Sequence, residues 1–223
     1  MEAKEYRLNI DPRILELLGP SLYTNIYYII AELIANAYDA DAHNVYIIDS
    51  EDKITVEDDG NGMSYAGGDI DKYLNVARVS RNSEDDAETA LGRKKMGRKG
   101  VGKLAALSVS ENVLVKTMVN DEKSGFVLSR TVKEDRLLQS LDESDINFEK
   151  ITQHGTAIVM LNPQYQLHAT VKAIRRNLLK LFPMVSEDFK IHIIRGKEEA
   201  VISNFDKDMI KELASLITLG DDF

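Results

Sequence analysis

The sequence predicts an α+β protein in which helices lie on one face of a mixed, mostly antiparallel β-sheet. Short runs rich in β-branched and aromatic residues come in pairs. The clearest pair, residues 44–49 and 53–58, is joined by a three-residue turn at 50–52. Elsewhere apolar residues recur at helical spacing, as they do from Leu22 to Ile34 and over 170–181. Strand pairs combined with amphipathic helices give the α+β prediction.

The individual elements can be placed in chain order from their caps and breakers. Asp11-Pro12 is suited to begin a first helix that ends near Gly19-Pro20, and Ser21 is suited to cap the second helix. Residues 64–99 are polar and punctuated by glycine, apart from one helical patch, which is typical of a functional or mobile segment. The other expected elements are a helix at 104–109, strands at 112–118 and 125–132 around a hairpin loop at 120–123, a strand at 156–161, a helix at 170–181, a last strand at 189–194 and a helical pattern at 203–223.

The composition excludes several classes of protein. The 223-residue chain contains no cysteine, which excludes disulfide bonds, thiolate catalysis and cysteine-based zinc sites. Its start lacks the basic flank and apolar stretch of a signal peptide, and no apolar run approaches the ~20 residues of a membrane span. We therefore expect a soluble, cytoplasmic protein with no membrane partner.

The charge pattern argues against a nucleic-acid surface spread over the whole domain, because the net charge is -9. Positive charge is concentrated locally, and its outer members also fit a solvated loop. Lys103, at the start of an expected helix, is the member best suited to meet phosphate. This basic cluster consists of Arg93, Lys94, Lys95, Arg98, Lys99 and Lys103.

Two motifs carry polar residues that could bind a ligand: one lies on an expected helix and the other in a glycine-containing turn. Glu32 and Asn36 lie four residues apart in an apolar helical run, so they share one helix face, and Asp39 lies a further turn along. In the stretch 58–63, Asp58 is followed by two glycines, which let the backbone approach a flat or charged ligand. Both are residue patterns suited to a ligand site.

Two further motifs complete a nucleotide-binding pattern. Residues 97–103 have the glycine and lysine content of a phosphate cradle that opens a helix. Gly155 and Thr156 open an apolar strand. A lone glycine-rich box would be weak evidence, whereas four ordered motifs favour a nucleotide site strongly.

In this order the four motifs resemble those of the GHKL ATPases: gyrase B, the ninety-kilodalton heat-shock chaperones, histidine kinases and MutL. The resemblance spans roughly Ile26 to Leu161. The matching positions are Glu32, Asn36, Ala37, Asp39 and Ala40 for the N-box, Asp58, Gly60, Gly62 and Met63 for the first glycine box, Gly97, Gly100 and Gly102 for the second, and Gly155 and Thr156 for the closing motif.

The resemblance implies a Bergerat-type two-layer sandwich that binds ATP with Mg²⁺ and hydrolyses ATP slowly. Glu32 would be the general base that activates water, Asn36 would supply an oxygen ligand to Mg²⁺, and Asp58 would accept a hydrogen bond from the adenine amino group. The expected nucleotide-binding residues are Asn36, Asp39, Asp58, Gly60, Gly62, Met63, Gly97, Gly100, Val101, Gly102, Lys103 and Thr156.

Structural interpretations compete with these roles. Asp39 could equally hold the helix in place, and Met63 could be core filler, the usual role of methionine. Asp59 is expected to be only a turn residue. The histidines at 43, 154, 168 and 192 show no ligand spacing, so no catalytic role is assigned to them.

The expected organisation is an ATP-binding domain over 1–165, with an ATP lid at about 64–99, and a helix-strand-helix extension over 166–223. The extension could begin a following domain of a longer protein. The sequence looks most like the MutL and MORC branch and its bacterial relatives, which implies nucleotide-dependent homodimerisation and contact with DNA through other domains. A nucleotide sensor with negligible turnover, and less strongly a histidine-kinase-type catalytic domain, are the alternatives.

Overall fold

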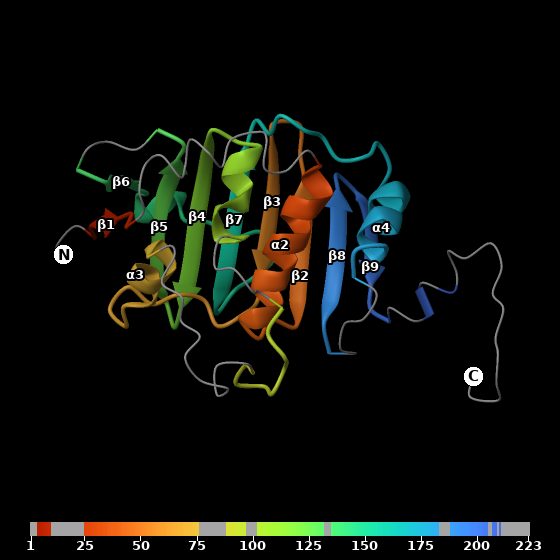
Figure 1. Ribbon diagram of the computed structural model, residues 1–223, viewed down its shortest axis with the longest axis horizontal. Coiled ribbons are helices and arrows are strands. Elements are labelled where there is room, and N and C mark those ends of the chain that lie inside the picture. Colours follow the sequence, from red (N-terminus) through yellow and green to blue (C-terminus); the bar gives the residue numbers. More distant parts are fainter. Residues whose placement is uncertain are drawn as a thin grey trace.

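A computed structural model describes residues 4–9, 25–75, 88–96, 102–131, 135–182 and 188–204, together with 207, 208 and 210; residues 102 and 103 are described by backbone alone. The strands in these ranges form a nine-stranded sheet with the order β1-β6-β5-β4-β7-β3-β2-β8-β9 (Figure 1). The strands are β1 (Tyr6–Arg7), β2 (Asn44–Asp49), β3 (Lys53–Asp58), β4 (Asn112–Val119), β5 (Glu122–Ser129), β6 (Leu137–Ser140), β7 (Gly155–Leu161), β8 (Lys190–Arg195) and β9 (Glu198–Ile202). The helices are α2 (Ile26–Asp39), α3 (Asp69–Leu74), α4 (Val171–Leu179) and the 3-10 helices η2 (Gly102–Ser108) and η3 (Glu143–Asp145).

The sheet is mixed and mostly antiparallel, as predicted. Among the described strands, every neighbouring pair runs antiparallel except β2 and β8, which are parallel. Helices α2, η2 and α4 lie in front of the sheet in Figure 1, on the same face. The α+β prediction with helices on one face is therefore confirmed.

The core lies between α2 and the central strands. The buried side chains of α2 recur at helical spacing, and alternate residues of β2 and β3 face them. Full burial of one such side chain contributes about 1.5–3 kcal/mol, so this contact fixes how α2 is rotated about its axis. The fully or nearly fully buried residues are Ile26, Ile29, Ile30, Leu33 and Ile34 of α2, Val45 and Ile47 of β2, and Ile54 and Val56 of β3.

Helix α2 begins at Ile26, later than the sequence predicts. The Asn25 side chain accepts the Tyr27 N–H at 2.9 Å and thus caps the helix. The described helix therefore takes its N-cap from Asn25. Ser21 and the helix expected from Asp11 lie outside the described residues.

The hairpin between β4 and β5 is tighter than predicted. Val119 pairs with Glu122, so the turn consists of Asn120 and Asp121, which have φ angles of 46° and 67°. Two consecutive positive φ angles match the twist of a hairpin, and asparagine and aspartate tolerate them better than most residues. The predicted loop at 120–123 is therefore wrong, and β5 begins and ends earlier than predicted.

The sequence did not reveal β1, β6 and β9. The first two are a short edge pair, and β9 pairs with β8 around a turn at Gly196, whose φ is 59°. The strand predicted at 189–194 is therefore not the last. The helix predicted at 104–109 begins at Gly102 and is a 3-10 helix, whereas the helix predicted at 170–181 is confirmed as α4.

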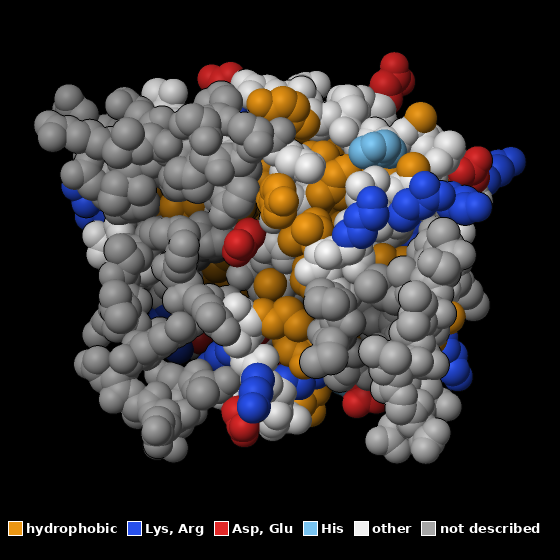
Figure 2. All heavy atoms as spheres, turned by 45° about the vertical axis from the view of Figure 1, so that its right-hand side comes forward, with side chains coloured by type: hydrophobic (Ala, Val, Ile, Leu, Met, Phe, Trp, Pro, Cys, Tyr) orange, Lys and Arg blue, Asp and Glu red, His pale blue; other side chains and the backbone are white. Residues whose placement is uncertain are grey.

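The segment predicted as a C-terminal extension contributes to the same sheet, because β8 pairs with β2 over six residues. In a space-filling view with this side turned forward, hydrophobic side chains gather in the middle of the face and the largest group of Lys and Arg side chains lies to the upper right (Figure 2). Helix α4 supplies exposed Lys172, Arg176 and Lys180, and Tyr28 of α2 is 52% exposed.

Candidate functional site

Three polar side chains lie in one row at the end of the central strands. Asp58 of β3 pairs with Thr156 of β7, and Thr156 pairs with Thr117 of β4. Directly paired residues of antiparallel strands point to the same face, here the face that α2 covers. The row lies near the C-terminal end of α2, because the Asn61 N–H donates to the Ala40 carbonyl at 2.9 Å.

The loop after Asp58 requires its glycines because it passes close to neighbouring backbone. Gly62 has a φ of 66°, and a Cβ there would lie 2.4 Å from the Met118 carbonyl oxygen. A Cβ on Gly60 would lie 2.8 Å from the Ala40 carbonyl oxygen and from Asp58 Oδ1. A side chain at either position would push the loop off the sheet, so the two glycines keep this backbone beside the Asp58 carboxyl group.

Asp58 is buried, and burial favours the protonated, neutral form of its carboxyl group. Burial is the largest effect and raises the pKa of its carboxyl group to about 7. The Gly60 N–H lowers this pKa, the neighbouring acids Asp59 and Glu57 raise it further, and the Thr156 N–H makes the smallest contribution, which lowers it. The Gly60 N–H donates to Asp58 Oδ1 at 2.9 Å. A buried carboxyl group of this kind is suited to accept a hydrogen bond from a ligand amino group, which would replace lost water.

The polar stripe predicted on α2 lies along the edge of its buried face. Glu32, Asn36 and Asp39 are all half-buried. Within the described residues, no hydrogen bond or ion pair engages the side chains of Glu32 and Asn36. The Asp39 carboxylate accepts the Met96 N–H at 2.7 Å, so it contacts the segment predicted as a lid.

A stretch of the predicted lid is attached to the C-terminal end of α2. Residues 88–96 form a turn in which buried Arg93 donates to the Ala42 carbonyl at 2.6 Å and lies over the Tyr38 ring, 4.9 Å from its centroid. The Leu91 N–H also donates to the carboxylate of Asp41, between α2 and β2, at 3.4 Å. Nothing in the local sequence distinguishes Arg93 from the solvated members of the basic cluster, so its anchoring role was not predicted.

The predicted phosphate cradle lies mainly outside the described residues. This applies to Gly97, Gly100 and Val101, as it does to residues 76–87 and 97–99 of the predicted lid. The backbone of Gly102 and Lys103 begins η2, which packs on α2 through a run of buried residues, Leu104 to Leu107.

Met63 and Thr156 are each half-buried, and Thr156 lies beside Asp58 in the pairing of β3 and β7. Met63 packs against the edge of the core, and its N–H donates to the Thr117 hydroxyl at 2.7 Å. The structure thus brings Asp58, Gly60, Gly62, Met63 and Thr156 together at one end of the sheet. It also adds Thr117, which sequence reasoning did not single out because an isolated strand threonine carries no signal.

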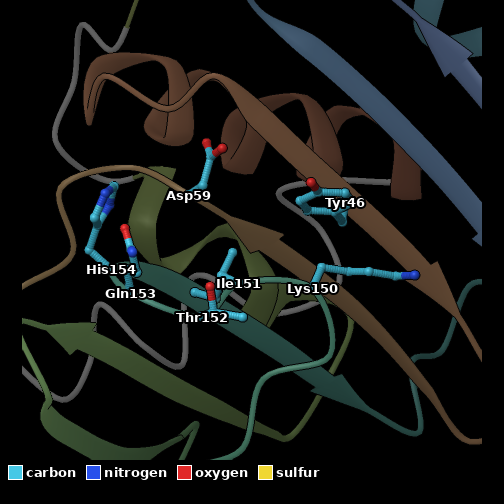
Figure 3. Close-up of a pocket in the computed structure, with 7 residues that line it drawn as sticks. All are labelled: Tyr46, Asp59, Lys150, Ile151, Thr152, Gln153 and His154. Carbon is cyan, nitrogen blue, oxygen red and sulfur yellow. The ribbon is translucent and has the colours of Figure 1, made fainter.

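The opposite face of the sheet, here called the open face because helices α2, η2 and α4 lie on the other one, bears a second buried carboxylate. Glu57 accepts the N–H groups of Glu149, Lys150 and Ile151 at 3.0, 2.6 and 2.7 Å. This clamp holds the segment that leads into β7 and borders a pocket of about 230 Å³ on the open face (Figure 3). The residues around this pocket are Tyr46, Asp59, Lys150, Ile151, Thr152, Gln153 and His154.

Asp59 and the histidines make structural contacts. Asp59 accepts the N–H groups of His43 and Asn44, both at 2.7 Å, which ties the strand end to the start of β2. His154 Nδ1 lies 2.7 Å from the Gly60 carbonyl oxygen, and the His192 ring stacks on Tyr46 with a centroid distance of 4.6 Å. Asp59 is therefore more than a turn residue, because it joins two strands.

The sandwich and its site, with an acidic strand end, a glycine loop and a polar stripe on the covering helix, define a GHKL-type ATPase domain. The chain belongs to the family "Histidine kinase-, DNA gyrase B-, and HSP90-like ATPase", whose sequence profile matches residues 23–156. The nine-stranded sheet is consistent with the Bergerat fold of that family. Membership of this family supports ATP binding.

One relative is the "Putative type II restriction enzyme HgiDII" of Herpetosiphon aurantiacus. It is 28% identical over 228 aligned positions, which cover 99% of this chain and 36% of the relative. The chain therefore spans about a third of that relative's length.

Among the described helices, none is long and apolar enough to cross a membrane.

Proposed function

We propose that this chain binds ATP together with Mg²⁺ and hydrolyses ATP slowly. The observation that carries the proposal is the buried Asp58 carboxyl group, which faces the helix side in one row with Thr156 and is bordered by the glycine loop. Asp58 would accept a hydrogen bond from the adenine amino group, Thr156 would contact the same edge, and Met63 would pack on the ring.

The stripe on α2 supplies the groups for metal binding and catalysis. The Asn36 amide oxygen would hold Mg²⁺, which neutralises phosphate charge when it is bound. The half-buried Glu32 carboxylate is available to orient water and accept its proton.

The remaining phosphate contacts are proposed for the second glycine box. Gly97, Gly100, Val101, Gly102 and Lys103 would hold the phosphates, because backbone N–H groups at a helix start attract anions. Asp39 contacts Met96 and thereby links α2 to the proposed lid. Closure of residues 64–99 over a triphosphate would then reach the helix that carries Glu32.

The domain is proposed to act within a larger, cytoplasmic protein. Residues 1–165 would carry the nucleotide contacts, and 166–223, which also adds β8 and β9 to the sheet, would connect to a following domain. Nucleotide-dependent homodimerisation would couple ATP to work elsewhere. The relative named as a type II restriction enzyme suggests that this work involves DNA, through other domains.

Phosphate release from ATP by the purified chain tests the proposal. Glu32→Ala should retain nucleotide affinity and lose turnover by about 10²-fold or more, the scale of removing a general base. Asn36→Ala should lose both, because metal and phosphates leave together. Glu51→Ala, which removes an exposed glutamate in the β2–β3 turn, serves as the control and should change neither.

Phosphate release, nucleotide binding and label transfer, measured on the same proteins, separate the alternatives. Turnover that persists unchanged in Glu32→Ala would make Glu32 structural. Tight binding with no phosphate release from the wild-type chain would support a nucleotide sensor. Transfer of the labelled γ-phosphate to protein would support a kinase of the histidine type.

A further inference from the structure

A buried threonine joins two segments of the proposed adenine site. Thr117 of β4 is completely buried, with 0% exposure. Its hydroxyl oxygen accepts the Met63 N–H at 2.7 Å and donates its proton to the Gly155 carbonyl at 3.1 Å. A threonine hydroxyl has one proton to donate, so this side chain uses both its donor and an acceptor site.

The two segments that meet at this hydroxyl carry the proposed walls of the adenine site. Met63 is the residue proposed to pack on the ring, and Gly155 immediately precedes Thr156. Because both backbones bond to the same oxygen atom, Thr117 Oγ1 sets the spacing between them. The close approach of Gly62 to the Met118 carbonyl confirms that this loop lies directly on β4.

The junction is held from the open face as well. His154 Nδ1 lies 2.7 Å from the Gly60 carbonyl oxygen, so its N–H group can donate there. On the helix face, the Thr117 hydroxyl holds the same two segments through its bonds to Met63 and Gly155. The Met63 N–H has no place in the strand ladders, so a residue without a hydroxyl at 117 would leave this donor without its partner beside a fully buried side chain.

We propose that Thr117 is a positioning residue for adenine recognition, an inference that rests on the proposed function. Its hydroxyl fixes the Met63 and Gly155 backbones relative to each other, and with them the proposed adenine contacts Met63 and Thr156. Thr117 itself is too deeply buried to touch the nucleotide. Loss of the hydroxyl therefore relaxes the selection of the base and leaves the phosphate contacts in place.

The test compares Thr117→Val, which keeps the shape and removes the hydroxyl, with Thr117→Ser, which keeps the hydroxyl. ADP and GDP affinities are measured by calorimetry at a temperature where circular dichroism shows every variant folded. Thr117→Val should bind ADP about tenfold more weakly and lose most of its preference for ADP over GDP. Thr117→Ser should remain within about threefold of the wild type in both.

The outcomes distinguish this inference from the proposed function. If the wild-type chain does not bind ADP, the proposed function fails. If the wild type binds ADP and Thr117→Val keeps the same ADP affinity and base preference, even with a lower melting temperature, Thr117 is merely structural and the inference is overturned. Should Thr117→Val not fold, Thr117→Cys, with a weaker hydrogen-bonding group, is measured instead, and the same ratio decides.

Discussion

The last two residues of β3 place carboxyl groups on opposite faces of the sheet, in opposite environments. Glu57, on the open face, receives three backbone N–H groups at 3.0 Å or less and holds the segment before β7. Asp58, on the helix face, has a pKa raised to about 7, chiefly by burial. A carboxylate saturated by the protein serves the fold, whereas one left short of donors is ready for a ligand.

Gly155, the first residue of β7, lies against the backbone of Asp58, and substitution there should have the largest effect on stability. It has a φ of 140°, and a Cβ there would lie 1.9 Å from the Asp58 carbonyl oxygen. Gly155→Ala should therefore lower the free energy of unfolding by about 3 kcal/mol or more, from backbone strain and overpacking together. Chemical denaturation measures this loss.

Gly196→Ala is the control for backbone strain alone. Gly196 has a φ of 59°, yet no atom lies within 4 Å of its added Cβ. Its substitution should cost only about 1 kcal/mol. Equal losses at the two positions would mean that the close contact beneath Gly155 does not matter.

Asp58→Asn should separate binding from folding on the helix face. The amide keeps an oxygen for the Gly60 N–H but cannot make the proposed charge-assisted bond to adenine. Calorimetry should show ADP and ATP binding weakened by about 2 kcal/mol or more, with the apo fold intact. Unchanged affinity would refute the role of Asp58.

Glu57→Gln should show the converse on the open face. The amide retains one acceptor and turns its NH₂ group toward a backbone donor, so at least one of the three bonds is lost. The free energy of unfolding should fall by about 1–2 kcal/mol, with a smaller change in ADP affinity than Asp58→Asn causes. A variant that kept full stability and lost nucleotide binding would reverse the roles assigned to the two carboxylates.

The smallest expected effect is a pH dependence that comes from Asp58 alone. Its pKa of about 7 in the folded chain lies above the value of ~3.9 for an unfolded aspartate. The folded state therefore binds the proton more tightly, and stability falls as the pH rises through 7. From pH 6 to pH 8 the free energy of unfolding should drop by about 1 kcal/mol.

Asp58→Asn should remove this component of the pH profile, because the amide does not titrate. ADP affinity should change in the opposite direction and strengthen toward pH 8, since an ionised carboxylate is the stronger acceptor for the proposed adenine hydrogen bond. Wild-type and variant stability curves that run parallel from pH 6 to pH 8 would show that Asp58 does not titrate in this range and would refute the raised pKa.

The local sequence was sufficient for elements whose signal is contained within them. The apolar spacing of α2, the β2–β3 pair and the amphipathic α4 are examples, and the α+β class follows from them. Polar side chains at fixed helical spacing, such as Glu32 and Asn36, also share a face whatever the rest of the chain does. Strands whose pairing depends on an edge, such as β1, β6 and β9, gave no such signal.

The sequence by itself thus determined the fold class and the motif residues Glu32, Asn36 and Asp58 of this ATPase-family domain. Only the tertiary structure decided which residues support that site. Thr117, Arg93 and Glu57 look ordinary in their own segments, and each acquires its role from partners far along the chain. Local propensity acts over a few residues, whereas strand register and burial join distant ones, so these contacts exist only once the sheet and α2 have come together.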